Sequence, residues 1–513
     1  MRCWPDNCCS ERVLEAPKSK VTKAEWRAVA TIVKEKLAFD ALRPGQHQAL
    51  EAVLEGRDTL AVLPTGSGKS AIYQIAGLMI DGPTVVVSPL IALQRDQREA
   101  IEHGQLGTVA LLNSLEPATE REAAFEELQS ADLEFLLLAP EQFGNPDTLA
   151  RLREAKPSLF VVDEAHCVSE WGHSFRPDYL RLGAVIDALG HPRTLALTAT
   201  ASPSVRREIC ERLHLRDPAV VVSGFDRPNI HLSVRGLTGE ALKLRNLVEM
   251  LEELELPGIV YTATRKHAEM VAAALVADGR RAVAYHAGMK RDERNGRQTA
   301  FMSGQADIIV ATTAFGMGID KPNVRFVVHY DVSDSLDAYY QEIGRAGRDG
   351  GPARAILLFS DKDLNLRRFF ASSGRISKDD TALLIRTLAQ QSEAISLAAL
   401  ARSSGLSRTK TASVVARLEE RAVVVRDATG RVSLSGSAGV AEDAIQAAVD
   451  AQAKLREAYR ARVEPMHAYA RTRDCRRALL LAHFGDTSAA ECAGCDNCGR
   501  GVPAPHPPLA AAQ

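Results

Sequence analysis

The sequence predicts an α/β protein with two parallel-sheet domains in tandem, followed by two smaller C-terminal modules. Short apolar runs rich in Val and Leu alternate with helical stretches from residue 58 to about 200, and a second series of the same kind extends from 257 to 360. Runs without polar alternation are typical of strands buried on both faces of a parallel sheet. The length of 513 residues agrees, because it corresponds to roughly three to four domains of ordinary size.

The boundaries of the two α/β domains follow from these runs. Residues 24–55 read as helical, and the first set of strands is DTLAVL, TVVVSP, LEFLLLAP, SLFVVD and TLALTAT. The stretch SGFDRPNIHLS, around 223–233, contains Gly and Pro and predicts a linker. The second set of strands is PGIVYTAT, RAVAYHAG, ADIIVATT, VRFVVHYD and ARAILLFS. We therefore expect an N-terminal segment over 1–35 and α/β domains over 36–223 and 224–372.

The remaining chain reads as two modules and a tail. The stretch 395–435 predicts a helix, a turn at Gly405, a second helix capped by Ser407 and a hairpin turn near Gly430. This order is typical of a winged helix, although a less regular linker domain is the alternative. An Ala- and Arg-rich pattern from 441 to 474 predicts a long helix. The expected boundaries are a winged-helix-like domain over 380–440, a helical module over 441–500 and a disordered tail over 501–513.

Four of the nine cysteines have the spacing of a metal site. Cys475, Cys492, Cys495 and Cys498 form a C-x16-C-x2-C-x2-C pattern, which can place four thiolates around one tetrahedral Zn²⁺. Nine cysteines are too few for a disulfide scaffold at this length. Three others form a looser N-terminal cluster, Cys3, Cys8 and Cys9, for which a frayed segment and a second metal site both stay open. The helical module over 441–500 is therefore predicted to bind zinc.

The charge and hydropathy of the chain indicate more about its cellular location than about its binding partners. The formal net charge of −2 averages over domains and does not exclude local basic patches that bind an anionic polymer. No run approaches the roughly 20 apolar residues that a membrane span needs, and the N-terminus does not resemble a secretion signal. We expect a cytoplasmic protein without a membrane partner.

The clearest chemical motif is LPTGSGKS, residues 63–70, between a predicted strand and a predicted helix. A Gly-rich turn at a helix N-terminus exposes backbone N–H groups to phosphate, the Lys reaches the outer phosphates, and the Ser hydroxyl can bind Mg²⁺. The predicted contacts to nucleotide come from Thr65, Gly66, Ser67, Gly68, Lys69 and Ser70.

Two adjacent carboxylates, Asp163 and Glu164, end the predicted strand SLFVVD. One carboxylate can hold Mg²⁺ while its neighbour orients and deprotonates the attacking water. Alone, such a pair is more often solvated charge or a helix cap. Together with the phosphate loop upstream, it predicts nucleotide hydrolysis.

The stretch EWGHSFRPDY, residues 170–179, comes directly after these carboxylates and has an unusual composition for a connecting loop. It contains Trp171, His173, Phe175 and Arg176. Bases stack on such aromatic rings whatever their identity, at about 1 to 3 kcal/mol each, and arginine binds phosphate or stacks as well. These residues are therefore candidates for binding single-stranded nucleic acid. The alternative is a structural loop whose Trp and Phe pack into the core.

Taken together, the motifs resemble the RecQ family of superfamily-two DNA helicases. The motifs that carry this resemblance are FDALRPGQ, the phosphate loop, SPLIALQRDQ, APEQF, VVDEAHC, LTATA, VYTATR, YHAGM, ATTAFGMGIDKPNVR, QEIGRAGRDG and, before the cysteines of CAGCDNC, MHAYARTRDCRRALLLAHFGD. The resemblance covers about 36–370 and 455–499. It implies two RecA-like domains, the cofactors ATP, Mg²⁺ and Zn²⁺, and a loop behind VVDEAHC that senses single-stranded DNA.

The resemblance also implies roles for individual residues. Phe39 would stack on adenine, with Arg43 and Gln46 contacting the base. Arg348 would be an arginine finger delivered from the second domain, with Arg345 as its companion. The nucleotide pocket would be completed by Gly316 and Asp320, and the catalytic set by His166 of VVDEAHC.

The chain departs from the family pattern in two places. Gln142 follows APE where the family commonly has Arg, and the winged-helix-like segment precedes the zinc cysteines instead of following them. In that segment Lys410, Arg417 and Arg421 are spaced by seven and four residues, which predicts one basic stripe on the second helix. We expect this stripe to bind the phosphates of duplex DNA, with a solvated helix edge as the alternative.

The sequence therefore predicts a monomeric ATP-dependent DNA helicase that moves 3′ to 5′ on single-stranded DNA, unwinds duplex or forked DNA and acts in repair or recombination. One alternative is a DEAH-type RNA remodelling ATPase. The other is a DNA-binding platform with a vestigial ATP site, although Lys69, Asp163, Glu164 and Arg348 are all present.

Overall fold

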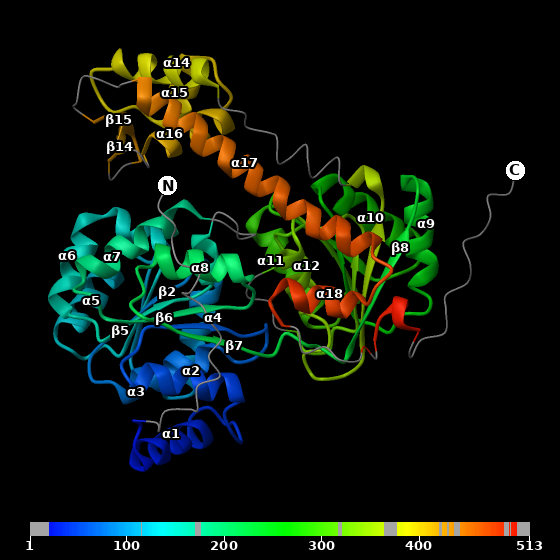
Figure 1. Ribbon diagram of the computed structural model, residues 1–513, viewed down its shortest axis with the longest axis horizontal. Helices are drawn as coiled ribbons and strands as arrows, with labels where there is room; N and C mark the ends of the chain where they lie inside the picture. The colour runs from blue at the N-terminus through cyan, green and yellow to red at the C-terminus, as the bar shows by residue number, and fades with distance from the viewer. Residues whose placement is uncertain are drawn as a thin grey trace, which may run out of the picture.

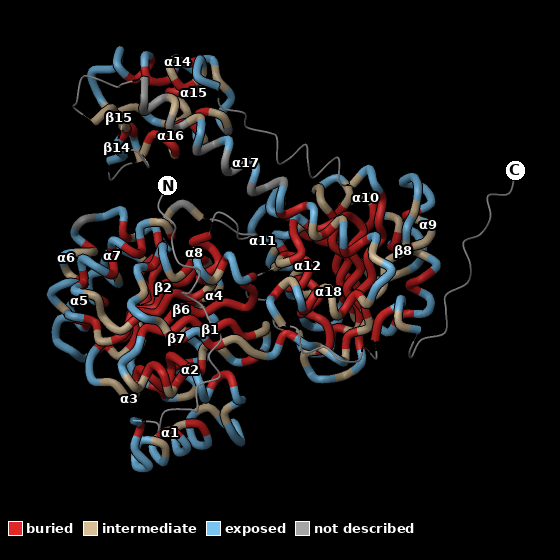
Figure 2. Tube along the Cα trace, viewed as in Figure 1, coloured by how far each residue is buried: buried red, intermediate tan, exposed pale blue. Residues whose placement is uncertain are grey.

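Two parallel sheets, each flanked by helices, form the body of the computed structural model, as predicted (Figure 1). The structure describes residues 20–113, 115–169, 176–316, 321–363, 377–419, 423–427, 430–435, 442–486, 492 and 494–499. Buried segments concentrate in the two sheets and the helices packed on them (Figure 2). In the described part of the chain, no helix is both long and apolar enough to cross a membrane.

The first sheet is parallel throughout, with the strand order β3-β4-β2-β5-β6-β1-β7. Its strands are β1 (Thr59–Val62), β2 (Thr84–Val87), β3 (Val109–Leu112), β4 (Phe135–Leu138), β5 (Leu159–Val162), β6 (Arg193–Thr198) and β7 (Ala219–Val222). The accompanying helices are α1 (Lys23–Glu35), α2 (Pro44–Leu54), α3 (Ser70–Met79), α4 (Ile91–His103), α5 (Ala118–Gln129), α6 (Pro146–Ala155), α7 (Leu182–Ala188) and α8 (Pro203–Arg212). Short 3-10 turns are η1 (Pro140–Gly144), η2 (Ala165–Val168) and η3 (Pro177–Arg181).

The helical prediction for 24–55 is confirmed in α1 and α2 and is wrong for residues 36–43 between them. Pro44 is the first residue of α2, and Arg43 before it is extended at φ −70° and ψ 153°. A proline disfavours helical geometry in the residue that precedes it, so the first helix ends upstream. Helix α1 packs against α3 and contributes Val29 and Val33 to the core on one face of the first sheet.

The second sheet is also parallel, with the strand order β10-β11-β9-β12-β13-β8. Its strands are β8 (Ile230–Gly236), β9 (Gly258–Tyr261), β10 (Ala282–Tyr285), β11 (Ile308–Ala311), β12 (Phe326–His329) and β13 (Ala353–Phe359). Its helices are α9 (Glu240–Met250), α10 (Arg265–Ala277), α11 (Arg291–Met302) and α12 (Leu336–Ile343). Strands β7 and β8 belong to different sheets, so residues 223–229 link the two domains.

A small module with its own apolar core follows. It contains α14 (Lys378–Ala389), α15 (Leu397–Ser404), α16 (Arg408–Glu419) and the antiparallel hairpin β14 (Val424–Arg426) and β15 (Val432–Leu434). Leu400, Val414 and Leu418 are fully buried in this core. The order of helices and hairpin is the one the sequence predicts, and the assignment as a winged helix stays a prediction.

The chain then returns to the second sheet through α17 (Glu442–Arg471), which runs from the small module to the second α/β domain (Figure 1). One end of α17 packs against α14 and α16, and the other against α12 and α18 (Arg476–His483). The last described turn, η4 (Asp496–Cys498), lies beside β8. The C-terminal module therefore packs on the second domain although the small module separates the two in sequence.

Candidate functional site

The phosphate loop connects β1 to α3 at the carboxyl end of the first sheet. Its two glycines have φ values of 77° at Gly66 and 72° at Gly68, a region that other residues rarely adopt. A Cβ at Gly68 would also lie 2.8 Å from Nε2 of Gln46. The glycines therefore allow both the turn and the close approach of α2.

Helix α2 holds the phosphate loop through Gln46. Its Nε2 donates to the carbonyls of Ser67 (2.8 Å) and Gly68 (2.9 Å), and its Oε1 accepts from the backbone N–H of Arg43 (2.8 Å). The Arg43 guanidinium donates to the carbonyl of Gly66 at 3.0 Å. Both side chains were expected to contact a base, and here they bind the loop itself.

A cavity of about 750 Å³ lies between the two sheets and brings together most of the predicted nucleotide contacts. It is lined from the first domain by Phe39, Arg43, Gln46, Thr65, Gly66, Ser67, Gly68, Lys69, Ser70, Asp163 and Glu164, and from the second by Gln341, Arg345 and Arg348. Phe39 is 42% exposed, unusual for a large apolar side chain, and is accessible for stacking. The volume suits a ligand the size of a nucleoside triphosphate.

The carboxylate pair sits at the end of β5. Asp163 is 8% exposed and accepts hydrogen bonds from the backbone N–H of Glu164 (2.9 Å) and from Nε2 of Gln97 (3.1 Å). Burial and the neighbouring Glu164 raise the pKa of Asp163 to about 6, against the opposing effect of Lys69. Burial has the opposite effect on Lys69 and lowers its pKa, and the negative charges of Glu164 and Asp163 counteract that decrease. These oxygen donors fit Mg²⁺, whose charge would keep both carboxylates ionised.

His166 links the carboxylate pair to the next strand. It is fully buried, and its Nδ1 lies 2.9 Å from Oγ1 of Thr198 at the end of β6 and 3.3 Å from Oε2 of Glu164. His166 therefore holds Glu164 in place and does not line the cavity.

The two arginines of the second domain follow α12 directly and line the cavity, with Arg348 against the phosphate loop. A Cβ at Gly66 would be 3.6 Å from both Cγ and Cδ of Arg348. Arg345 is 4% exposed, and its guanidinium is 3.7 Å from the Cβ position of Gly316. The predicted pair of arginines thus reaches the cavity from the other sheet. Asp320 lies outside the described residues.

The predicted loop for single-stranded nucleic acid is described only at its end, since Trp171, His173 and Phe175 lie outside the described residues. The Arg176 guanidinium donates to the carbonyl of Pro89 at 2.5 Å. Tyr179, which the sequence places in the same stretch, is fully buried and donates to the carbonyl of Asp163 at 3.0 Å. The segment behind the loop is therefore bonded directly to the catalytic strand.

The exposed basic stripe expected on α16 is wrong in its geometry. Arg417 is only 5% exposed, because α16 packs against α14, α15 and α17. Lys410 pairs with Asp380 of α14 at 2.7 Å, and Arg421 lies outside the described residues. DNA contact by Lys410 stays a prediction.

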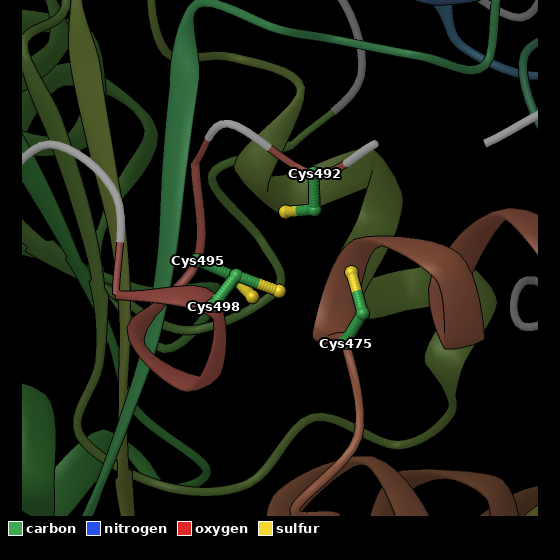
Figure 3. Close-up of side chains that lie close together, drawn as sticks. All are labelled: Cys475, Cys492, Cys495 and Cys498. Atoms are coloured by element: carbon green, nitrogen blue, oxygen red, sulfur yellow. The ribbon is translucent and has the colours of Figure 1, made fainter. Parts of the chain in front are cut away.

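The four predicted zinc ligands converge in the C-terminal module (Figure 3). Their Sγ atoms all lie within 4.8 Å of one another, and a tetrahedral Zn²⁺ with bonds of about 2.3 Å needs sulfur atoms about 3.8 Å apart. Cys475 precedes α18, and the loop containing Cys495 is attached to β8, since the carbonyl of Gly494 accepts from the N–H of Leu232 at 3.0 Å. The arrangement fits a structural zinc, because four protein ligands leave no open position.

Two residues that bind Asp163 were not predicted as site residues. Gln97 donates to the carboxylate of Asp163, 66 residues away in sequence, and Tyr179 donates to the backbone carbonyl of Asp163. Gln97 closes the motif SPLIALQRDQ, which was the available signal for it.

Comparison with known proteins gives three family matches along the chain. Residues 43–209 match the DEAD/DEAH box helicase family, residues 242–350 the helicase conserved C-terminal domain, and residues 439–499 the RecQ zinc-binding family. The matches cover both sheets and the cysteine module. The small module from α14 to β15 lies between the second and the third.

Curated proteins similar to this chain are also named as helicases. The chain is 40% identical over 356 residues to a probable ATP-dependent DNA helicase RecS of Bacillus subtilis, covering 69% of this chain and 71% of that protein. It is 40% identical over 325 residues to the ATP-dependent DNA helicase RecQ of Pasteurella multocida, covering 63% of this chain and about half (51%) of the relative. Among solved structures, the helicase MrfA bound to DNA aligns with a TM-score of 0.56 at 16% identity over 84% of this chain and 64% of that one, which shows the fold alone.

Zinc loading gives the first testable prediction. Metal analysis should find one zinc per chain, and Cys495→Ser should lose it together with much of the resistance to protease, because the buried Cys495 carries the loop attached to β8. Cys210→Ser is the matched control, since Cys210 lies on α8 outside the cluster and should leave the zinc content unchanged. A zinc-free Cys495→Ser protein with unaltered protease resistance would contradict a structural role.

Proposed function

This chain belongs to the RecQ family of DNA helicases, and we propose that it hydrolyses ATP to move 3′ to 5′ along single-stranded DNA and to unwind duplex or forked DNA in repair or recombination. One observation carries the proposal. Lys69, the Asp163–Glu164 pair and Arg348 come from two sheets and line one cavity of nucleotide size.

The proposed chemistry assigns each group a task in phosphoryl transfer. The loop N–H groups and Lys69 bind the phosphates. Asp163 and the Ser70 hydroxyl would hold Mg²⁺, which would neutralise charge on the phosphates. Glu164, oriented by His166, accepts a proton from the attacking water. Arg348, with Arg345, stabilises the charge that spreads over the γ-phosphoryl oxygens in the transition state.

We propose that the loop containing Trp171, His173 and Phe175 binds single-stranded DNA and controls this chemistry. The bonds of Arg176 to Pro89 and of Tyr179 to Asp163 support the proposal, because a movement of the loop would be passed to the catalytic strand. Phe39 would stack on adenine while Arg43 and Gln46 keep the phosphate loop in place.

The small module is proposed to bind the duplex ahead of the single strand. Arg426 on its hairpin pairs with Glu419 at 2.8 Å, and the pKa of Arg426 is raised by that pair and, more weakly, by Asp178 of the first domain. The proposal includes a cytoplasmic monomer, as the sequence predicts.

Strand displacement tests the function directly. The protein with ATP should separate a 3′-tailed or forked DNA substrate and leave a 5′-tailed one and an RNA duplex largely intact. Lys69→Ala is the control for ATP dependence and should abolish strand separation. Equal activity on RNA would favour the RNA remodelling alternative, and DNA binding without any hydrolysis would favour the vestigial platform.

Arg348→Ala should separate binding from chemistry. We expect turnover to fall about 10³-fold and ATP affinity to change no more than about threefold, because the arginine acts on the transition state. Arg471→Ala is the matched control, since this exposed arginine pairs with Asp361 away from the cavity. The expectation fails if ATP affinity drops strongly while turnover is unchanged.

Trp171→Ala and Phe175→Ala should each lose more of the DNA stimulation of ATP hydrolysis than of the affinity for single-stranded DNA. The physical reason is that stacking is shared among several bases, whereas signalling depends on the loop position. Trp26→Ala is the control, because Trp26 of α1 stacks on His47 of α2, with ring centroids 4.0 Å apart, and does not line the nucleotide cavity. Full stimulation in both loop variants would remove the sensor role.

A further inference from the structure

The linker between the two sheets, residues 223–229, forms hydrogen bonds to the turn after α12 that carries Arg345 and Arg348. The Arg227 guanidinium donates to three carbonyls of this turn, those of Gly344 (3.3 Å), Ala346 (2.9 Å) and Gly347 (3.0 Å). The turn begins where α12 ends, so these carbonyls include unsatisfied acceptors at the negative end of the helix dipole. A cation that spans them fixes the direction in which the turn leaves the helix.

A second linker residue holds the same turn from its far end. Nδ2 of Asn229 donates to the carbonyls of Gly347 and Gly351, both at 2.8 Å, and its own carbonyl accepts from the N–H of Ala353 at 2.9 Å. Gly347 has a φ of 56°, and a Cβ there would lie 2.5 Å from Nδ2 of Asn229. Arg345 and Arg348 flank this tightly packed glycine.

The linker is itself held from the other side by the zinc-binding module. Arg477 of α18 donates to the Asp226 carboxylate at 2.5 Å and to the carbonyl of Ile230 at 2.8 Å. Phe484 stacks on Phe225, with ring centroids 4.6 Å apart and planes within 10°. Arg227 is therefore part of a braced segment and not of a loose connection.

We propose that Arg227, together with Asn229, is a positioning residue that sets Arg345 and Arg348 in the nucleotide cavity, with Arg348 against the phosphate loop. The inference rests on the proposed ATP hydrolysis. Arg227 does not line the nucleotide cavity, so it acts through the arginines. Because the linker joins the two sheets, the position of the arginines is tied to the relative orientation of the domains, and hydrolysis is permitted only in the closed arrangement.

A double-mutant cycle tests this inference on the full-length protein with single-stranded DNA. Arg227→Ala should lower the single-turnover rate of hydrolysis about tenfold or more, while affinity for a non-hydrolysable ATP analogue stays within about twofold. In the Arg348→Ala background the same change should cost clearly less than in the parent, because one of the two arginines through which Arg227 acts is already absent. Losses that multiply in the double variant would overturn the inference, as would an unchanged rate in Arg227→Ala.

Controls separate positioning from general damage. Arg281→Ala removes an exposed arginine of the same domain that pairs with Asp307, and it should leave hydrolysis unchanged. Arg227→Lys keeps the positive charge but loses the planar guanidinium that donates to three carbonyls at once, so it should give an intermediate rate. If Arg227→Ala does not fold, Asn229→Ala takes its place in the cycle with the same criteria. A parent protein without DNA-stimulated hydrolysis would refute the proposed function itself, whereas a parent with normal activity leaves the outcome to Arg227 alone.

Discussion

The contact of Arg348 with the phosphate loop of the opposite sheet is the constraint on which the site depends. The loop has no side chain at Gly66, so the aliphatic part of Arg348 can approach to 3.6 Å of the missing Cβ. A cavity lined from both sheets is complete only when the sheets are held together. Each domain supplies only part of the cavity lining, so the proposed hydrolysis would depend on domain orientation.

The charges around Lys69 explain why this site suits a nucleotide with a metal ion. Asp163 and Glu164 repel each other in a buried position, and the pKa of Asp163 rises to about 6 as a result. Lys69 offsets part of that repulsion, but Arg348 nearby acts against the charge on Lys69. Bound Mg²⁺ would relieve the carboxylates and the phosphates would relieve the two cations, so ligand binding replaces internal repulsion with attraction.

The sequence predicted what depends on local patterns. Both parallel sheets, the glycine-rich turn and the four-cysteine spacing follow from short-range periodicity and residue chemistry, and the structure places them as expected. Prediction from the sequence failed where tertiary packing determines which side chains are exposed and which residues meet. Arg417 has helical spacing to Lys410, but its face is covered by helices whose arrangement the spacing does not contain. Arg227 is separated by more than a hundred residues from the carbonyls it binds, so no local pattern could assign its role.

The position of the small module before the cysteines raises a geometric problem that α17 solves. The zinc-binding module must reach the second sheet, because its Tyr469 meets Tyr339 of α12 at 3.2 Å between hydroxyls and its His483 binds Asp337 at 2.8 Å. The 30 residues of α17 span about 45 Å, enough to bring the chain back from the small module. In the last turns of α17, Met466 and Tyr469 are fully buried, and Tyr469 packs on Tyr339 of α12. A continuous helix can thus carry a module at one end while its other end packs on α12, the helix that precedes Arg345 and Arg348.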